Sequence, residues 1–127
     1  MILVDTSIWI DHLHAADSTL VSLLSQSMVA THPMVIGELA LGSLRDRKKF
    51  LELLADLPPL PAANHDEVLY FVNEKRLYGK GLSLVDAHLL ASVRLSSGAR
   101  LWTRDKRLAT VARTLGVVFH GAYYNRR

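Results

Sequence analysis

Short apolar runs alternate with amphipathic segments along the chain, and this alternation predicts its secondary structure. Ile2-Leu3-Val4 is an apolar run that predicts a buried strand ending at Asp5. Thr6 or Ser7 can cap a helix that runs to about residue 14. Further elements expected in the first half are a helix that starts at 17–18, a weak strand at 28–30, a helix from 33 to about 42 and a charged helix at about 45–56.

The second half continues the alternation of strands and helices. Its expected elements are a possible strand at 60–63, helices at about 66–78 and 83–96, a strand at 100–103, a helix at about 105–115 and a last strand at 117–119. Such alternation is typical of an α/β fold, a three-layer α/β/α sandwich around a mostly parallel sheet. The Pro-rich break at 57–61 is too short to separate domains, so residues 1–127 are expected to form a single domain.

Composition narrows the chemistry. The chain has no cysteine, which excludes disulfides, thiolate catalysis and thiolate metal sites. Fifteen Lys and Arg residues against twelve Asp and Glu residues leave a net charge of +3, which favours nucleic acid as a partner. No apolar run approaches the roughly 18 residues of a membrane helix, and the N-terminus does not resemble a signal peptide. We therefore expect a cytoplasmic protein that does not enter a membrane.

Acidic residues follow two of the predicted strands. Asp5 and Asp105 each come at or just after the end of an apolar strand and at the start of a helix. In parallel sheets, ligands bind in the crevice beyond the carboxyl ends of the strands, so these two carboxylates could face one cleft. Each could equally be an ordinary helix N-cap. Asp86 has the same ambiguity, because Ser83-x-x-Asp86 has the form of a capping box.

Glu38 is harder to explain as a surface residue. It lies in the run 34–41, which contains no other charge, so full solvation of its carboxylate is not expected. Burying an unpaired carboxylate costs several kcal/mol, and clustered carboxylates repel one another. A divalent cation removes both penalties, and a site made only of oxygen ligands suits Mg²⁺ or Mn²⁺.

Four short strings around these acids carry a family resemblance. They are Val4-Asp5-Thr6-Ser7, Ile36-Gly37-Glu38-Leu39, Leu84-Val85-Asp86-Ala87 and Leu101-Trp102-Thr103-Arg104-Asp105. In order and spacing they resemble the motifs of PIN-domain nucleases, and in particular the VapC-type toxins of bacterial and archaeal toxin–antitoxin pairs. The resemblance runs from residue 2 to residue 119.

The resemblance implies a PIN-like α/β/α fold in which Asp5, Glu38, Asp86 and Asp105 converge as the catalytic and metal-binding acids. It also implies an Mg²⁺- or Mn²⁺-dependent endoribonuclease that acts on RNA and is inhibited by a cognate antitoxin protein. We interpret Asp5 and Asp86 as the principal ligands, while Glu38 and Asp105 would bind through water, hold a second ion or position the nucleophile. Thr6 and Thr103 carry over as supporting hydroxyls.

Basic and apolar residues suggest where partners bind. Arg104, Lys106 and Arg107 flank Asp105 and are candidates for contact with the RNA backbone. A second basic cluster at 45–49 is interpreted as a solvated helix face, and Arg126 and Arg127 end the chain. An antitoxin groove could be lined by Trp9, Leu13, Leu24, Leu53, Leu54 and Leu57. These residues could instead lie in the core, which is expected for Leu53 and Leu54 more than for Trp9. A second apolar patch on the surface would support a homodimer.

Two other classes of protein stay open at this point. A receiver-type signalling domain has similar length and alternation, but usually needs an adjacent acidic pair after its first strand, where Thr6 and Ser7 stand here. A catalytically silent binding protein on the PIN fold is the second alternative. The six histidines show no zinc-site spacing, and neither a Walker loop nor a G-x-S-x-G elbow is present.

Overall fold

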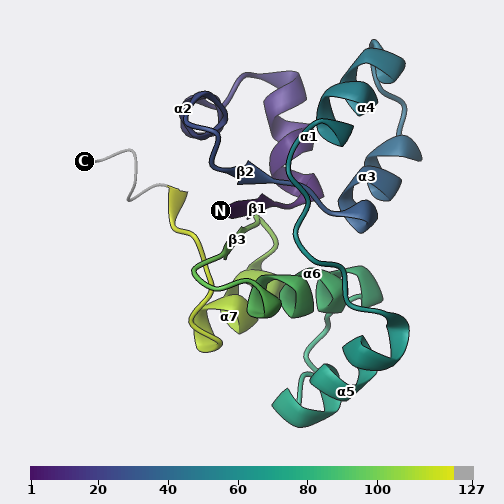
Figure 1. Ribbon diagram of the computed structural model, residues 1–127, viewed down its shortest axis with the longest axis vertical. Coiled ribbons are helices and arrows are strands. Elements are labelled where there is room, and N and C mark those ends of the chain that lie inside the picture. Colours follow the sequence, from purple (N-terminus) through teal and green to yellow (C-terminus); the bar gives the residue numbers. More distant parts are fainter. Residues whose placement is uncertain (122–127) are drawn as a thin grey trace.

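A parallel three-stranded sheet lies at the centre of the computed structural model, which describes residues 1–121 (Figure 1). Its strands are β1 (Ile2–Val4), β2 (Val29–Ala30) and β3 (Arg100–Trp102), in the order β2-β1-β3. Leu3 of the central strand is in register with Ala30 on one side and Leu101 on the other. The carboxyl ends of β1 and β3 therefore lie side by side.

Helices cover both faces of this sheet. They are α1 (Thr6–His14), α2 (Ser18–Ser25), α3 (Pro33–Ala40), α4 (Arg47–Ala55), α5 (His65–Lys75), α6 (Leu84–Leu95) and α7 (Lys106–Thr114). Figure 1 shows α6 and α7 on one side of the strands, with α1, α3 and α4 on the other. This arrangement confirms the three-layer α/β/α class. Among the described residues, no helix is long and apolar enough to cross a membrane.

Two predicted strands are reduced to single bridges. The segment expected at 60–63 reaches the sheet only through a bridge between Pro59 and Thr31, the residue directly after β2. Beside this bridge, the Leu60 amide donates a hydrogen bond to the Thr31 carbonyl. Prolines at 58, 59 and 61 have no N–H group, so the ladder cannot extend. The segment expected at 117–119 makes one bridge, between Leu101 and Val118. Arg76 also ends α5 earlier than expected, because it takes a left-handed conformation with φ 53°.

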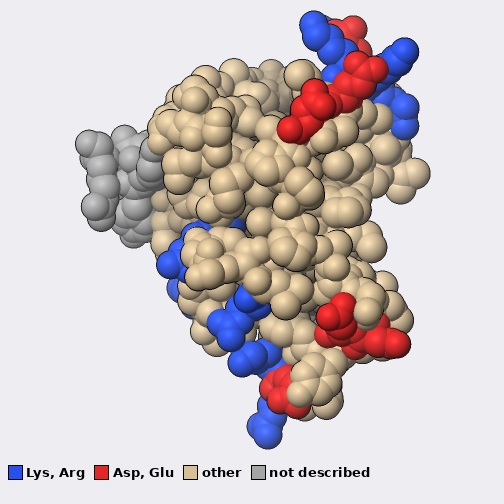
Figure 2. All heavy atoms as spheres, viewed as in Figure 1, with Lys and Arg blue, Asp and Glu red and all other residues tan. Residues whose placement is uncertain are grey.

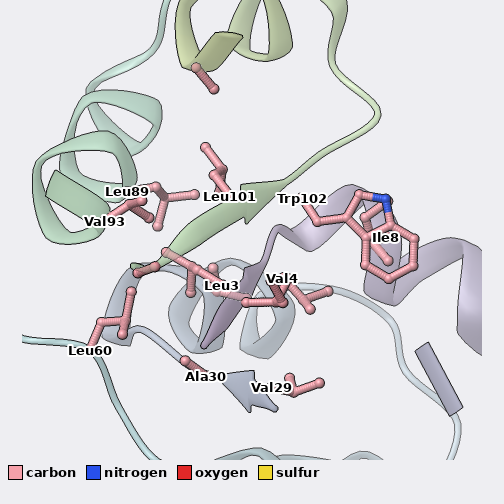
Figure 3. Close-up of a cluster of buried hydrophobic side chains, with 14 of the residues drawn as sticks. Leu3, Val4, Ile8, Val29, Ala30, Leu60, Leu89, Val93, Leu101 and Trp102 are labelled. Atoms are coloured by element: carbon pink, nitrogen blue, oxygen red, sulfur yellow. The ribbon is translucent and has the colours of Figure 1, made fainter. Parts of the chain in front are cut away.

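The core holds the strands in place. Leu3, Val4 and Leu101 are fully buried against Ile8 of α1 and Leu89 of α6 (Figure 3). Each such side chain stabilises the fold by about 1.5–3 kcal/mol on burial. Because the strands are packed on both faces, the residues that leave their carboxyl ends start from fixed positions.

The sequence-based expectation about Leu53 and Trp9 is wrong. Trp9 is only 4% exposed and packs edge-on against Phe50, whereas Leu53 is 58% exposed. Leu54, the neighbour of Leu53, is buried as expected. The helix α4 therefore turns Leu54 inward and Leu53 outward, as adjacent helical positions 100° apart require.

A buried histidine begins α3. His32 is 1% exposed, and its Nδ1 accepts a 3.0 Å hydrogen bond from the Met34 amide at the start of the helix. An acceptor at Nδ1 leaves the proton of the neutral ring on Nε2, which lies 2.8 Å from the Ser92 hydroxyl of α6. Burial, followed by the nearby His88, lowers the pKa of His32 to about 4. This neutral ring ties α3, which carries Glu38, to α6, which carries Asp86.

Candidate active site

Asp5 is the centre of the candidate site. It leaves the end of β1 and is 7% exposed. Its Oδ1 accepts a hydrogen bond from the Thr6 amide at 2.7 Å. Its Oδ2 accepts from the hydroxyls of Thr103 at 2.6 Å and Ser7 at 3.1 Å. These donors fix the orientation of a carboxylate that burial would otherwise disfavour.

The turn after β3 is fastened to Asp5 by two hydroxyls. Thr103 Oγ1, which donates to Asp5, accepts from the Asp105 amide at 3.1 Å. Ser7 Oγ likewise donates to Asp5 and accepts a hydrogen bond from the Arg104 amide at 3.1 Å. Thr103 was predicted from the sequence as a supporting hydroxyl, whereas Ser7 was predicted only as an alternative helix cap. The Thr6-Ser7 pair directly after an acidic strand end was the signal that could have identified Ser7.

Asp105 caps α7, and it also belongs to the group of acids. Its Oδ1 accepts a 2.9 Å hydrogen bond from the Leu108 amide, as an N-cap does. The side chain is exposed, and its charge acts on Asp86. The capping and site interpretations of Asp105 therefore do not exclude each other.

Asp86 is likewise both a cap and a member of the group. Its amide donates to the Ser83 hydroxyl at 3.1 Å, and its Oδ2 accepts from the Ser83 amide at 3.0 Å, which completes the expected capping box. Burial raises the pKa of Asp86, and the negative charges of Asp5 and Asp105 raise it further, against the opposing hydrogen bonds from Ser83. The carboxylates at the end of β1 and the start of α7 are therefore close enough to act on the carboxylate of α6.

Glu38 joins the group through Thr6. The Thr6 hydroxyl donates a 2.7 Å hydrogen bond to Glu38 Oε1, while the Thr6 amide donates to Asp5. The expectation that Glu38 escapes full solvation is wrong, because its side chain is exposed. The helix α3 buries Val35 and Leu39 instead, so the Glu38 face opens to water. Thr6 is therefore the residue that links the α3 carboxylate to the β1 carboxylate.

The donor set fits a hard divalent cation by its chemistry. The four acids and their hydroxyl partners offer only oxygen atoms, which Mg²⁺ and Mn²⁺ prefer. The repulsion that raises the pKa of Asp86 is the penalty that a bound cation removes. Within residues 1–121, however, no three acidic or histidine side chains are gathered closely enough to surround an ion. A cation would have to draw these carboxylates closer together.

Arg104 forms ion pairs within the protein, and its contact with the RNA backbone stays a prediction. Its guanidinium forms ion pairs with Asp11 of α1 and Asp17, the N-cap of α2, with a 3.2 Å distance to Asp17 Oδ2. All three side chains are partly exposed, so these pairs add little stability. They do engage the charge that was expected to contact RNA. Lys106 and Arg107 are exposed in the first turn of α7, whereas Arg126 and Arg127 lie outside the described residues.

An α/β/α sandwich with acids gathered where parallel strands end defines the class of protein, and the family model "PIN domain" matches residues 2–114. The chain belongs to the PIN-domain family. It is 57% identical over 117 residues to Ribonuclease VapC32 of Mycobacterium tuberculosis, strains CDC 1551 and H37Rv, which covers 92% of this chain and 94% of that protein. Its fold also matches the crystal structure of FitAcB from Neisseria gonorrhoeae, with a TM-score of 0.64 and 21% identity over 97% of this chain and 99% of that one.

Proposed function

We propose that this protein is a metal-dependent endoribonuclease of the VapC type, acting as the toxin of a toxin–antitoxin pair. The observation that carries the proposal is the grouping of Asp5, Asp86 and Asp105 where β1, α6 and α7 meet. The 57% identity to a protein named as a ribonuclease supports the same activity for this chain. The family match also weighs against a receiver-type signalling domain.

In this proposal Asp5 and Asp86 hold Mg²⁺ or Mn²⁺, and Glu38 and Asp105 bind through water, hold a second ion or position the nucleophile. When bound, the cation activates a water molecule and offsets the charge that develops on the phosphate. The protein contributes the orientation of its carboxylates. Thr103 and Ser7 orient Asp5 Oδ2, and Thr6 orients Glu38 Oε1, so these two acids need less reorientation when the cation draws the carboxylates together.

The RNA backbone would pass beside the start of α7. Lys106 and Arg107 directly follow Asp105 and are both exposed. A phosphate chain laid across the acids would therefore meet two positive charges as it leaves the site, which favours binding of a polyanion.

The proposed partner is an antitoxin that occupies the same site. A basic side chain from the antitoxin could pair with the acids and exclude the metal. Trp9 and Leu54 are buried and therefore cannot line the docking groove that the sequence predicted. Leu13 and Leu53 are exposed and can contact an amphipathic segment, with Leu24 and Leu57 partly buried behind them. Formation of a homodimer and a cytoplasmic location remain predictions.

The test is cleavage of single-stranded RNA by the purified protein with Mg²⁺, with Mn²⁺ and with EDTA. Asp86→Asn should lose cleavage, because the amide keeps the capping acceptor but not the charge. Asp66→Asn is the matched control, since Asp66 is an exposed acid in the first turn of a different helix, α5. Full cleavage in EDTA, or equal rates for both variants, would contradict the proposal. RNA binding without any cleavage would point to the catalytically silent alternative.

A further inference from the structure

A basic pocket of about 360 Å³ lies along the flank of α7. Its volume is at the lower end of the range for small-molecule sites, enough for one nucleotide rather than a folded partner. Its two walls are the segment 75–80 and the helix α7, and together they line the pocket with aliphatic side chains, cationic side chains and two threonines but no carboxylate. The residues that matter for the inference are Lys75, Lys80, Lys106, Arg107, Val111 and Leu115.

Both walls of this basic pocket begin beside the acids of the candidate site. Lys106 and Arg107 are the first two residues of α7, directly after its N-cap Asp105. Lys80 lies on the connection that leads into the α6 capping box, which holds Asp86. The Arg107 side chain lies against Gly81, so the segment that follows Asp105 and the segment that leads to Asp86 are side by side. An RNA chain that leaves the acids between these two segments would enter the pocket.

Within residues 1–121, the cations of the basic pocket form no salt bridge, although Lys75 also lines a second pocket that contains acids. These four cations, three lysines and Arg107, differ in this from Arg104, which forms two salt bridges. The Thr110 and Thr114 hydroxyls that also line the pocket donate to carbonyls of their own helix. Positive charge is therefore what the pocket offers to a ligand. An anion would relieve the repulsion among the four side chains.

A glycine makes room for one of these cations. Gly81 has φ +77°, and a Cβ atom at this position would lie 2.7 Å from Nη1 and 2.8 Å from Cδ of Arg107. The absence of a side chain lets the Arg107 guanidinium lie against the connection before α6. This contact orients the guanidinium beside the pocket without pairing its charge, as a site for phosphate requires.

This second pocket, of about 580 Å³, has a different character. It lies between α5 and α6, and its lining includes Asp66, Glu67 and Glu74 beside Lys75 and Arg94. Its charges largely cancel, with a small negative excess, which disfavours a polyanion. Figure 2 shows Lys and Arg side chains following the α7 edge of the molecule, Asp and Glu side chains over α5, and side chains of both charges over α4. Of these pockets and the one on α4, where Asp46 and Glu52 offset most of the positive charge, the α7 pocket has the most basic lining, which favours a nucleic acid there.

We propose that the basic pocket binds one nucleotide of the single-stranded RNA substrate, adjacent to the phosphodiester held at the acids. Lys75 and Lys80 would contact its phosphate, and the aliphatic side chains of the lining would accept the sugar or base. A duplex would not fit, because its phosphates lie outside and its bases are stacked within. This inference rests on the proposed function, since it concerns the path of the RNA that the site cleaves.

The test is the salt dependence of RNA binding in EDTA, measured by fluorescence anisotropy with a labelled single-stranded RNA. The Lys75→Ala/Lys80→Ala variant removes two proposed phosphate contacts. The slope of log K against log salt should fall by about 0.7, the value for one neutralised phosphate on a single strand, because both lysines contact the phosphate of the same nucleotide. The matched control is Lys48→Ala/Lys49→Ala, which removes the same charge from α4, where Asp46 and Glu52 stand close by. Its slope should equal that of the wild type.

An unchanged slope in the pocket variant, an equal loss in both variants, or no RNA binding by the wild type would overturn the inference. Cleavage with Mg²⁺ or Mn²⁺ is measured separately on the wild type. Cleavage together with an unchanged slope would refute the pocket and leave the proposed function standing. A slope loss confined to the pocket variant, without any cleavage by the wild type, would refute the function and leave the pocket standing.

Discussion

The hydroxyl of Thr103 lies 2.6 Å from Oδ2 of Asp5, although 98 positions separate them in the sequence. The same hydroxyl accepts a hydrogen bond from the amide of Asp105. One side chain at the end of β3 therefore positions the buried acid of β1 and the acid that begins α7. The parallel pairing of the two strands makes this contact possible, because it brings their carboxyl ends together.

Thr103→Val should separate this positioning role from the volume of the side chain. Removing the hydroxyl leaves Asp5 without one donor and the Asp105 amide without its acceptor. We expect a loss of about 1–3 kcal/mol in the free energy of unfolding and a matching loss of ribonuclease activity. Thr103→Ser keeps the hydroxyl and should stay close to wild type in both. Urea unfolding and RNA cleavage measure the two effects, and a Val variant with wild-type activity would show that the hydroxyl is dispensable.

Asp105 offers a clean way to remove one acid without removing a helix cap. Asn is as good an N-cap as Asp, so Asp105→Asn should melt at nearly the wild-type temperature. Its activity should fall by more than the roughly 100-fold that can follow the loss of a residue hydrogen-bonded to a metal ligand. Asp105→Ala should lose the same activity and about 0.5–2 kcal/mol of stability as well. An active Asn variant beside a destabilised Ala variant would reduce Asp105 to a structural cap.

Asp86 should make the metal-free protein less stable as the pH rises. Its pKa is raised in the folded state, so the folded protein holds this proton more tightly than the unfolded chain does. The stability it contributes is present below the ordinary value of 3.8 and is lost as the pH rises toward the raised pKa. At neutral pH and without metal, Asp86→Asn should therefore have a higher melting temperature than the wild type. The Asn side-chain oxygen can still accept the hydrogen bond from the Ser83 amide.

Bound metal should reverse the order of the melting temperatures of the wild type and Asp86→Asn. Mg²⁺ or Mn²⁺ at a hundredfold excess over Kd stabilises the wild type by about 2.7 kcal/mol, and Asp86→Asn should lose most of this response. Adding Glu38→Gln should remove the remainder. Calorimetric melting with EDTA and with each cation provides the measurement. A metal-free Asp86→Asn protein that melts below the metal-free wild type would show that the cap outweighs the repulsion.

His32 should make the fold sensitive to acid. Its pKa is lowered to about 4, so the unfolded chain takes up a proton near pH 6.5 while the folded protein does not. Stability is full above pH 6.5 and should fall by about 3 kcal/mol as the pH drops to 4. His32→Asn keeps a capping acceptor and should lose this dependence of stability on pH. The same change at exposed His14 should leave the dependence on pH as in the wild type. Parallel slopes in all three proteins would contradict the assignment.

The positions of Asp5 and Asp105 could be predicted because local signals marked them. A short apolar run predicts a buried strand, and an acid at its end before a helical pattern predicts a cap. Parallel pairing then brings such acids to one edge of the sheet. The Ser83–Asp86 capping box was equally local, and the structure contains it as expected.

Contacts between distant segments could not be predicted in this way. Nothing near Arg104 in the sequence indicates that Asp11 and Asp17 engage its charge. The exposure of Glu38 depends on how α3 rotates over the core, and the uncharged run around Glu38 suggested the opposite. Leu53 and Leu54 are indistinguishable by composition, yet one is exposed and the other is buried. These outcomes depend on tertiary packing rather than on local pattern.

The strand order has a consequence for when activity can begin during synthesis. The first strand made, β1, lies in the middle of the sheet, and one of its two neighbours, β3, is completed only at Trp102. Until that neighbour arrives, Asp5 has neither the Thr103 hydroxyl nor Asp105 beside it. A chain still emerging from the ribosome therefore carries the first acid but not the assembled site. A nuclease built in this order stays harmless to the messenger RNA from which it is being translated until most of its length has been made.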